Sequence, residues 1–333
     1  GMAGRGHAAA YRAASSLYGS DLPEIKLVSI GDVNAQFGLA AAKRFGFERH
    51  DSDWRAIADD PNIHAVSVVV ANSLHREIVE GLLASGKHVL CEKPLSDTLE
   101  DARSMVSAAK ASDKVASIGL TFLRNPAIAA IQKIIASGQL GKVLHFTGNY
   151  WADYSCDPMS PISWRYKGGM GTGALADIGS HISYVAEFIT GQTFKSVSGA
   201  RFVTAIAERP VPTGAVQGHS GATVSDKMDT VENDDYAGFI ADFGGVAGAI
   251  EVSRVAAGHP TSLEFEVYCE KGAARFTQSR NGEFELLLNE DPYGQRGFRT
   301  VQVGPAHPYI AGGLPVDAPE IGRASCRERV SSP

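Results

Sequence analysis

Asp177 and His181 have the residue types and the spacing that proton transfer requires. They stand four residues apart in a predicted helix, so they lie on one face of it. A carboxylate one turn away can orient a histidine and make it more basic, as a general base requires. The alternative is a buried pair whose members only satisfy each other's hydrogen bonds.

Lys93 is the third candidate for chemistry. It follows Glu92 at the end of a predicted strand, Lys87 to Cys91, and Pro94 then turns the chain away. A lysine at such an edge has little reason to be there for packing. It can hydrogen-bond a substrate hydroxyl and help to lower the pKa of that hydroxyl. The alternative is a structural ion pair.

Two further segments suit a dinucleotide. The opening residues, Gly1 to Gly4, are similar to the end of a G-x-G-x-x-G turn, in which backbone N–H groups at a helix N-terminus bind pyrophosphate. Asp32 follows the predicted strand Ile25 to Ile30, where a carboxylate accepts hydrogen bonds from both ribose hydroxyls of NAD. No arginine follows it to bind a 2′-phosphate, so NAD is favoured and NADP is the alternative. The alternative is that the glycines form a turn without function and that Asp32 is a solvated loop residue.

Asn72 and His75 come directly after a β-branched run, His64 to Val70, at its carboxyl end. In open α/β sheets that edge faces the ligand crevice, so both residues are candidate cofactor contacts. His75 could equally be a residue in the first turn of a helix that contacts no ligand.

The elements that position these residues alternate through the first third of the chain. Such alternation is typical of right-handed βαβ units and a parallel sheet. Ala35 to Phe45 is a predicted helix closed by Gly46, and Thr98 is a predicted cap of another that runs to about Ala111. The predicted strands are Ile25 to Ile30, His64 to Val70, Lys87 to Cys91 and Val115 to Leu120.

From about Thr121 the pattern changes to strands separated by turn pairs, which indicates a mainly antiparallel sheet. Two helices are predicted there, Pro126 to Ser137 and Ala174 to Thr190, the second after the glycine-rich stretch Gly168 to Gly173. Residues 208–229 are rich in turn formers and are interpreted as a long loop or lid. The predicted strands are Val143 to Trp151, Ser196 to Val203, Asp234 to Phe243, Val246 to Arg254, Leu263 to Cys269 and Glu283 to Leu288.

The predicted fold class is α/β, with two domains. Residues 1–121 form a Rossmann-type doubly wound parallel sheet without its first strand, and residues 122–319 form an α+β domain with a mainly antiparallel open sheet. Residues 320–333 resemble one reading frame of a sequencing-adapter DNA. We interpret them as an artefactual tail, with a short natural basic tail as the alternative.

The composition limits the class of protein. With 44% hydrophobic and 20% charged residues, a formal charge of −6 and no bilayer-length apolar run, the 333-residue chain is typical of a globular protein without a nucleic-acid or membrane surface. Its 4 cysteines are scattered and form no Cys/His cluster, so no metal site is expected and a reducing cytoplasm is predicted.

Taken together, the motifs resemble those of the Gfo/Idh/MocA oxidoreductases, the group around glucose–fructose oxidoreductase and inositol 2-dehydrogenase. The resemblance covers nearly everything from residue 1 to about residue 319. The matching motifs are Asn72-x-x-His75, Gly86-Lys87-His88-Val89, Glu92-Lys93-Pro94, Arg124-Asn125-Pro126, Trp164-Arg165 and the segment Gly173 to His181.

The resemblance implies an NAD(P)-dependent dehydrogenase that transfers a hydride between a sugar, inositol or related polyol hydroxyl and nicotinamide. In that scheme His181 takes the hydroxyl proton, Lys93 polarises the oxygen, and Asp177 positions the histidine or binds a neighbouring hydroxyl. Asp153 and Trp164 are further implied substrate contacts. The implied cofactor contacts are Gly1, Met2, Ala3, Gly4, Asp32, Ala71, Asn72, His75, Glu92, Lys93, Arg124, Trp164 and Arg165.

Two departures from the family pattern leave the substrate unassigned. Tyr184 stands where an aspartate is common, and Val70-Ala71 replaces a Thr-Pro type of pair. The resemblance also implies a homodimer or homotetramer through the open sheet. The alternatives are an NAD-assisted glycosidase of the same fold and a non-catalytic dinucleotide-sensing regulator, although a regulator would not need Lys93, Asp177 and His181 together.

We predict weak NAD binding for this chain, because a parallel sheet without a central strand exposes strand edges and loses part of its phosphate site. Titration of NADH, followed by nucleotide fluorescence, measures the affinity. Micromolar binding would contradict the prediction.

Overall fold

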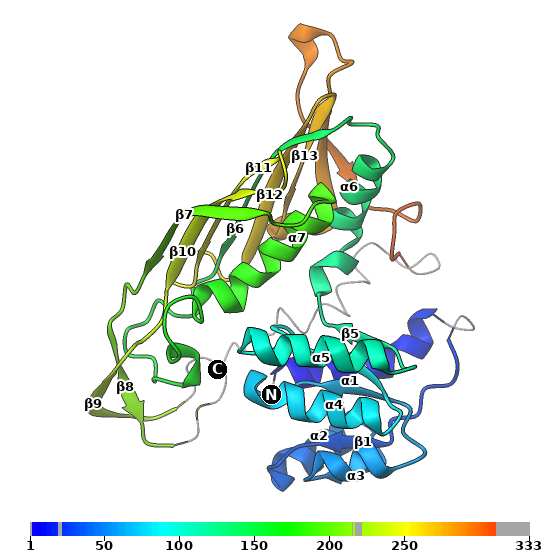
Figure 1. The fold of residues 1–333 in the computed structure, drawn as a ribbon, viewed down its shortest axis with the longest axis vertical. Helices are drawn as coiled ribbons and strands as arrows, with labels where there is room; N and C mark the ends of the chain where they lie inside the picture. Colours follow the sequence, from blue (N-terminus) through cyan, green and yellow to red (C-terminus); the bar gives the residue numbers. More distant parts are fainter. Residues whose placement is uncertain (1, 19–21, 215, 217–221, 311–333) are drawn as a thin grey trace. The chain divides into compact units, whose positions relative to one another are not determined.

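The computed structural model describes residues 2–18, 22–214, 216 and 222–310 (Figure 1). The predicted cofactor contact Gly1 and the predicted tail, 320–333, lie outside the described residues. The described residues up to Leu120 form one compact unit, and those from Thr121 to Ile310 form another. Each unit is considered by itself.

The first unit has five short parallel strands, which confirms the predicted parallel α/β arrangement. The strands form two groups, and within the described residues no strand joins the groups into one sheet. Arg49–Asp51 was not predicted as a strand, because it is a short polar segment with no apolar alternation. The first group is β1 (Ser29–Gly31) and β2 (Arg49–Asp51); the second is β3 (Ala65–Val68), β4 (His88–Cys91) and β5 (Ala116–Ile118).

Helices in the first unit begin and end where local chemistry directs them. The Asn34 side chain accepts the backbone N–H groups of residues 36 and 37, and Gly46 ends the same helix with a φ of 79°. Thr98 caps another helix by accepting the N–H of Asp101, as predicted. The helices are α1 (Met2–Tyr18), α2 (Ala35–Phe45), α3 (Trp54–Asp59), α4 (His75–Ala84) and α5 (Leu99–Ala111).

Helix α1 contacts both groups of strands or the helices beside them. The hydroxyl of Tyr11 lies 2.8 Å from the Ser67 hydroxyl on β3, and His7 Nδ1 lies 3.1 Å from the same oxygen. Arg12 donates a 3.0 Å hydrogen bond to the carbonyl of Phe45, at the end of α2. The first helix therefore provides a hydrogen-bonded connection between the two groups.

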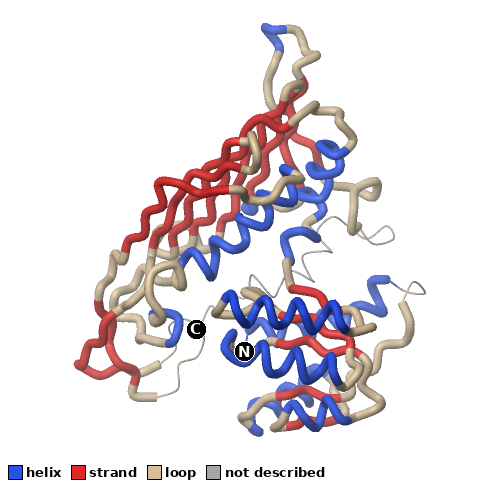
Figure 2. Tube along the Cα trace, in the orientation of Figure 1, coloured by secondary structure: helices blue, strands red, loops and turns tan. Residues whose placement is uncertain are grey.

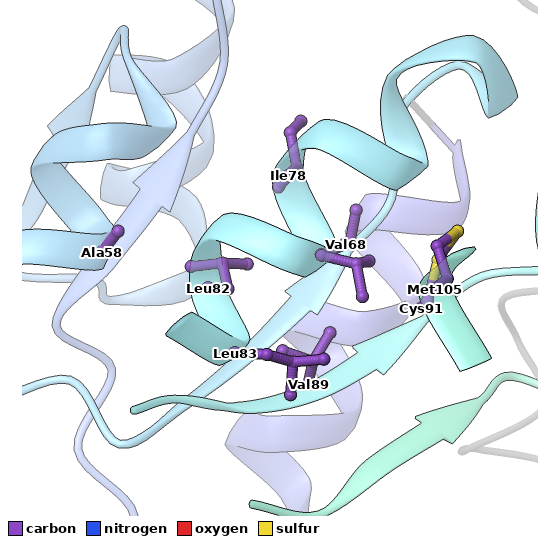
Figure 3. Packing of buried hydrophobic residues seen from close by; sticks show 9 residues of the cluster. Ala58, Val68, Ile78, Leu82, Leu83, Val89, Cys91 and Met105 are labelled. Atoms are coloured by element: carbon purple, nitrogen blue, oxygen red, sulfur yellow. The ribbon is translucent and has the colours of Figure 1, made fainter. Parts of the chain in front are cut away.

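One apolar cluster packs helices α4 and α5 against β3 and β4 (Figure 3). Leu82 and Leu83 of α4 meet Val68 of β3 and Val89 of β4, and Met105 contributes from α5. Burying one such side chain stabilises the folded state by about 1.5–3 kcal/mol. Ile78 and Val79 belong to the same cluster, so one face of α4 is apolar and buried.

The second unit is built on one eight-stranded sheet with helices on one face (Figure 2). Neighbouring strands are antiparallel except for the parallel pair of β6 and β11, so the mainly antiparallel prediction is confirmed. The spatial order is β15 (Arg299–Gln302), β14 (Glu283–Leu288), β13 (Gly272–Thr277), β12 (Ser262–Cys269), β6 (Val143–Trp151), β11 (Ala247–Ser253), β10 (Tyr236–Asp242) and β7 (Ser196–Val203).

Helices α6 (Pro126–Ala136) and α7 (Ser180–Thr190) pack on this sheet. Alternate residues of β6 face them, and Gly148 lets α7 approach closely, because a Cβ there would lie 2.7 Å from Cδ1 of Ile182. The predicted helix from Ala174 is divided: Leu175–Gly179 is a π-helical turn, and the α-helix begins at Ser180. Such turns are frequent at functional sites.

The prediction of a long loop at 208–229 is wrong at both ends of the segment, which are strands. β8 (Glu208–Pro212) and β9 (Val224–Thr230) pair as an antiparallel hairpin. Pro210 and Pro212 made the segment resemble a loop, but prolines are compatible with an edge strand. The predicted strands also missed β13, whose Ala273-Ala274 pair has weak β propensity and is buried by tertiary packing.

We predict that Leu82→Ala destabilises the protein by about 2–5 kcal/mol, because Leu82 is 1% exposed at the centre of the cluster in the first unit. Urea unfolding followed by circular dichroism measures the change. Leu99→Ala, at a position 66% exposed, is the matched control and is expected to stay within about 0.5 kcal/mol. Equal effects of the two substitutions would contradict the assigned core.

Candidate active site

Asp32 lies at the carboxyl end of β1, beside the end of β2. Its Oδ1 accepts the N–H of Asn34 at 2.9 Å, and its own N–H donates to the Asp51 carbonyl at 3.2 Å. Arg49 on β2 is committed to Asp51 at 2.8 Å and Asp60 at 2.6 Å. The end of β1 therefore presents an oriented carboxylate while the neighbouring guanidinium is neutralised, which suits ribose hydroxyls rather than a 2′-phosphate.

The segment after β3 places Asn72 and His75 differently. Ala71 is exposed and Asn72 begins a short 3₁₀ turn. His75 is fully buried, and its two ring nitrogens lie 3.1 Å from the Leu95 carbonyl and 3.2 Å from the Val70 carbonyl. Both ring nitrogens of His75 therefore face backbone carbonyls of this unit. This favours the alternative in which His75 is a residue in the first turn of a helix and contacts no ligand.

Glu92 and Lys93 follow β4, and the carboxylate of Glu92 forms a hydrogen bond with helix α1. Its Oε1 lies 2.8 Å from Nε2 of His7, and its Oε2 accepts the N–H of Lys93 at 3.0 Å. Burial by itself would raise the pKa of Glu92, but the bond to His7 and the Lys93 amide outweigh it, and the pKa lies below its usual value. The carboxylate is thus held charged beside Lys93, and its hydrogen bond to the Lys93 amide orients the backbone from which that side chain extends.

Asp177 belongs to the π-helical turn that precedes α7. The buried carboxylate of Asp234 binds the backbone at the start of this turn. Asp234 accepts backbone N–H groups from Gly171 at 2.7 Å, Gly173 at 3.1 Å and Leu175 at 2.8 Å. At Gly173 a Cβ would lie 2.1 Å from the Asp234 carbonyl oxygen, so this position requires glycine. The glycine-rich stretch therefore determines where Asp177 stands.

Asp177 is bonded to a tyrosine that was not predicted from the sequence. The Tyr154 hydroxyl donates a 2.7 Å hydrogen bond to its Oδ2. Burial, followed by the charge of the Asp177 carboxylate, raises the pKa of the Tyr154 phenol well above its usual range. Tyr154 therefore keeps its proton and donates it in the hydrogen bond to the Asp177 carboxyl group.

His181, one turn further along, lies in an aromatic cage and is 9% exposed. Its ring centroid lies 5.1 Å from that of Phe122, 5.7 Å from Tyr150 and 5.5 Å from Tyr184. Its Nδ1 lies 2.8 Å from the Tyr184 hydroxyl, and that oxygen accepts the N–H of Phe122 at 3.2 Å. The ring is thus packed against three aromatic side chains, and its Nδ1 is hydrogen-bonded to one of them.

A buried network of charged residues holds the segments around this helix. Arg254 donates to Asp235 at 2.8 Å and to Asn233 at 2.8 Å, and it also bonds to the carbonyl of Arg165. The guanidinium groups of Arg254 and Arg209 lie 4.7 Å and 4.4 Å from the centroid of the Tyr166 ring. This network ties strands β10 and β11 to the segment that carries Trp164 and Arg165.

The remaining predicted contacts lie on these same segments. Trp164 is 58% exposed, and the Arg165 guanidinium lies 4.5 Å from its ring centroid. Asp153 lies one residue before Tyr154, two residues after the end of β6. Arg124 donates a 2.7 Å hydrogen bond to the Tyr309 hydroxyl and lies over its ring, so it is committed to the second unit itself. Met2, Ala3 and Gly4 lie in the first turn of α1.

Within each unit the structure therefore brings predicted site residues together. Glu92, which precedes Lys93, contacts His7 in the first unit, and Asp177 and His181 lie one turn apart where the π-helical turn leads into α7 in the second. The sequence did not indicate Tyr154, and it indicated Tyr184 only as a departure from the family pattern, not as a partner of His181. The i, i+3 spacing of His181 and Tyr184 could have found the second, because residues three apart are neighbours on a helix.

The described residues were searched for membrane-spanning helices and for metal sites. No helix there is long and apolar enough to cross a membrane. In the same residues no group of three His, Cys, Asp or Glu side chains is arranged to hold a metal ion.

Comparison with known families matches both units. Residues 1–120 match the model described as oxidoreductase family, NAD-binding Rossmann fold, and residues 128–275 match the GFO/IDH/MocA C-terminal domain.

Among curated proteins, levoglucosan dehydrogenase of Pseudarthrobacter phenanthrenivorans is 37% identical over 331 residues, which cover 97% of this chain and 83% of that protein. The NAD-dependent scyllo-inositol 2-dehydrogenase of Bacillus subtilis is 27% identical over 180 residues, which cover 54% of this chain and 51% of that protein. The first likeness therefore extends through both units, and the second through about half of each chain.

Solved structures are also similar to this chain over nearly all of its length. Levoglucosan dehydrogenase in complex with NADH and levoglucosan is similar with a TM-score of 0.85 and 35% identity, over 98% of this chain and 86% of that one. An oxidoreductase domain protein from Kribbella flavida has a TM-score of 0.85 and 32% identity, over 96% of this chain and 84% of that one.

We predict that Arg254→Met destabilises the protein by about 3–5 kcal/mol, because it leaves the buried Asp235 carboxylate without its cation. Urea unfolding followed by tryptophan fluorescence measures the change. Arg55→Met is the matched control: this arginine is paired with Asp53 and Glu77, but its side chain is 58% exposed, so a loss of at most about 1 kcal/mol is expected. A loss below about 1 kcal/mol for Arg254→Met would contradict the importance of the network.

Proposed function

Because the chain belongs to the Gfo/Idh/MocA family of NAD-binding oxidoreductases, we propose that it is a dehydrogenase that oxidises one hydroxyl of a sugar or anhydrosugar. The observation that carries this proposal is the 37% identity with a levoglucosan dehydrogenase over 97% of the chain. The exposed Trp164 supports it, because an aromatic surface packs well against the C–H groups of a sugar ring.

The proposed roles follow from the chemistry of three side chains. His181 takes the proton of the substrate hydroxyl as the C–H bond of the same carbon breaks and its electron pair leaves as hydride. Lys93 donates a hydrogen bond to the oxygen and stabilises its developing negative charge while the carbonyl forms. Asp177, which is hydrogen-bonded by Tyr154, accepts a hydrogen bond from a neighbouring hydroxyl or orients the histidine.

Bound NAD supplies the hydride acceptor. Asp32 at the end of β1 would hold its ribose hydroxyls, and the engagement of Arg49 with Asp51 and Asp60 leaves that guanidinium neutralised rather than ready for a 2′-phosphate. The proposed contacts of Ala71, Asn72 and Glu92 lie after β3 and β4, at the carboxyl ends of parallel strands, where dinucleotides bind in this class of fold.

We also propose a homodimer or homotetramer that associates through the sheet face opposite α6 and α7. Figure 1 shows both helices on one face of the sheet in this unit. Light scattering coupled to gel filtration tests this assembly, and a monomer at micromolar concentration would contradict it.

The proposed location is the cytoplasm. Cys91, Cys156 and Cys269 are unpaired thiols, as is typical of proteins in reducing compartments.

We predict that Lys93→Met and His181→Asn each lower kcat by about 10²–10⁴-fold, because each removes a group that moves or polarises the substrate proton. The assay follows substrate-dependent NADH formation at saturating NAD, with levoglucosan, aldoses and inositols as substrates. NADH binding, measured by nucleotide fluorescence, is expected to persist in both variants.

Lys110→Met is the matched control, since Lys110 is exposed on α5, and its turnover should equal that of the unsubstituted chain. Unchanged turnover in Lys93→Met would contradict the proposed function. Glycoside cleavage without net NADH formation would also contradict it.

A further inference from the structure

We propose that Tyr184 is a positioning residue that holds His181 in the tautomer whose Nε2 accepts the substrate proton, a role that rests on the dehydrogenase function proposed above. Imidazole has two nitrogens, and in the neutral ring only one of them can accept a proton. Which one does so depends on the hydrogen bond that the other nitrogen makes.

The contact between the two residues is short and comes from helix geometry. Tyr184 follows His181 by three residues on α7, so the two side chains are neighbours on the helix surface. The Tyr184 hydroxyl lies 2.8 Å from Nδ1, and the two rings are nearly perpendicular, at 74°. Tyr184 therefore contacts the ring at the nitrogen nearer the backbone.

Two further groups limit movement within this contact. The N–H of Phe122 donates to the Tyr184 oxygen at 3.2 Å, which anchors the hydroxyl to backbone outside α7. The Phe122 ring also packs against His181, edge to face, with 5.1 Å between centroids. Phe122 thus restrains both members of the pair, one through its backbone and the other through its ring.

In the proposed arrangement the Tyr184 oxygen accepts a hydrogen bond from His181, and this direction sets the tautomer. A phenol oxygen can accept hydrogen bonds from both the Phe122 N–H and an Nδ1–H of His181. In that arrangement Nε2 carries the lone pair that takes the substrate proton. If the Tyr184 O–H donated to Nδ1 instead, Nε2 would already carry a proton and could not act as a base.

The proton transfer then balances without any change at Tyr184. The substrate O–H bond breaks, its proton forms an Nε2–H bond, and the imidazolium keeps its Nδ1–H bond to the neutral phenol oxygen. The hydride leaves the same substrate carbon for NAD, so the two electrons of the C–H bond reduce the cofactor. Tyr184 orients the ring without supplying the full negative charge that an aspartate would supply.

Steady-state kinetics of Tyr184→Phe test the role. Without the hydroxyl the ring loses its tautomer preference, so we expect kcat to fall by about 10–100-fold, less than the roughly 10⁴-fold known for loss of a charged partner in a serine protease triad. KM and NADH binding should change little, because the ring volume is kept and the loss falls on the chemical step.

Tyr236→Phe is the matched control. It also removes one phenol hydroxyl from the second unit, but that hydroxyl donates to Glu251 on the neighbouring strand. Its kcat should equal that of the unsubstituted chain. Unchanged kcat in Tyr184→Phe, with thermal unfolding similar to the control, would overturn the proposal, and so would a rise in KM with kcat unchanged.

The tautomer is measured directly by ¹⁵N NMR of the full chain, with the His181 signals assigned by their absence in His181→Asn. The neutral ring is expected to show a protonated, pyrrole-type Nδ1 and an unprotonated, pyridine-type Nε2, and Tyr184→Phe should abolish this bias. The reverse pattern in the unsubstituted chain would overturn the proposal. If no sugar supports NADH formation, the dehydrogenase proposal fails, while the NMR result still decides the tautomer.

Discussion

The buried pair of Asp235 and Arg254 is the interaction on which the second unit depends. Both side chains are almost fully removed from solvent, and ions in such a place are tolerated only with complete partners. Asp235 has backbone N–H groups of residues 205 and 206 besides the arginine, and the arginine reaches the carbonyl of Arg165. Strands β10 and β11 are thereby joined to the segment with the exposed Trp164.

The adjacent Asp234 extends the same constraint to the π-helical turn that precedes α7. Its carboxylate accepts three N–H groups where the glycine-rich stretch enters the π-helical turn. Of these two neighbouring acidic residues, Asp235 binds Arg254, and Asp234 binds the backbone that leads into the π-helical turn. Asp177 and His181 then each form a hydrogen bond with a tyrosine hydroxyl, so a phenol contributes to the position of each.

Sequence patterns predicted most strands and helices well, because their signals are local. The β-branched runs, the Thr98 cap and the Gly46 end are present as expected. The prediction failed where pairing supplies the stability: β2 is short and polar, β13 contains two alanines, and the β8–β9 hairpin contains two prolines. Each of these strands exists because a neighbouring strand accepts and donates its hydrogen bonds.

The sequence by itself determined the fold class, the family and the identity of Lys93, Asp177 and His181 as candidates, since motif spacing and periodicity are properties of short segments. Only the tertiary structure decided their partners. Tyr154 reaches Asp177 across 23 residues, Asp234 reaches Gly171 across 63, and His7 reaches Glu92 across 85. Such contacts depend on how strands and loops fold back on one another, and no local pattern carries that information.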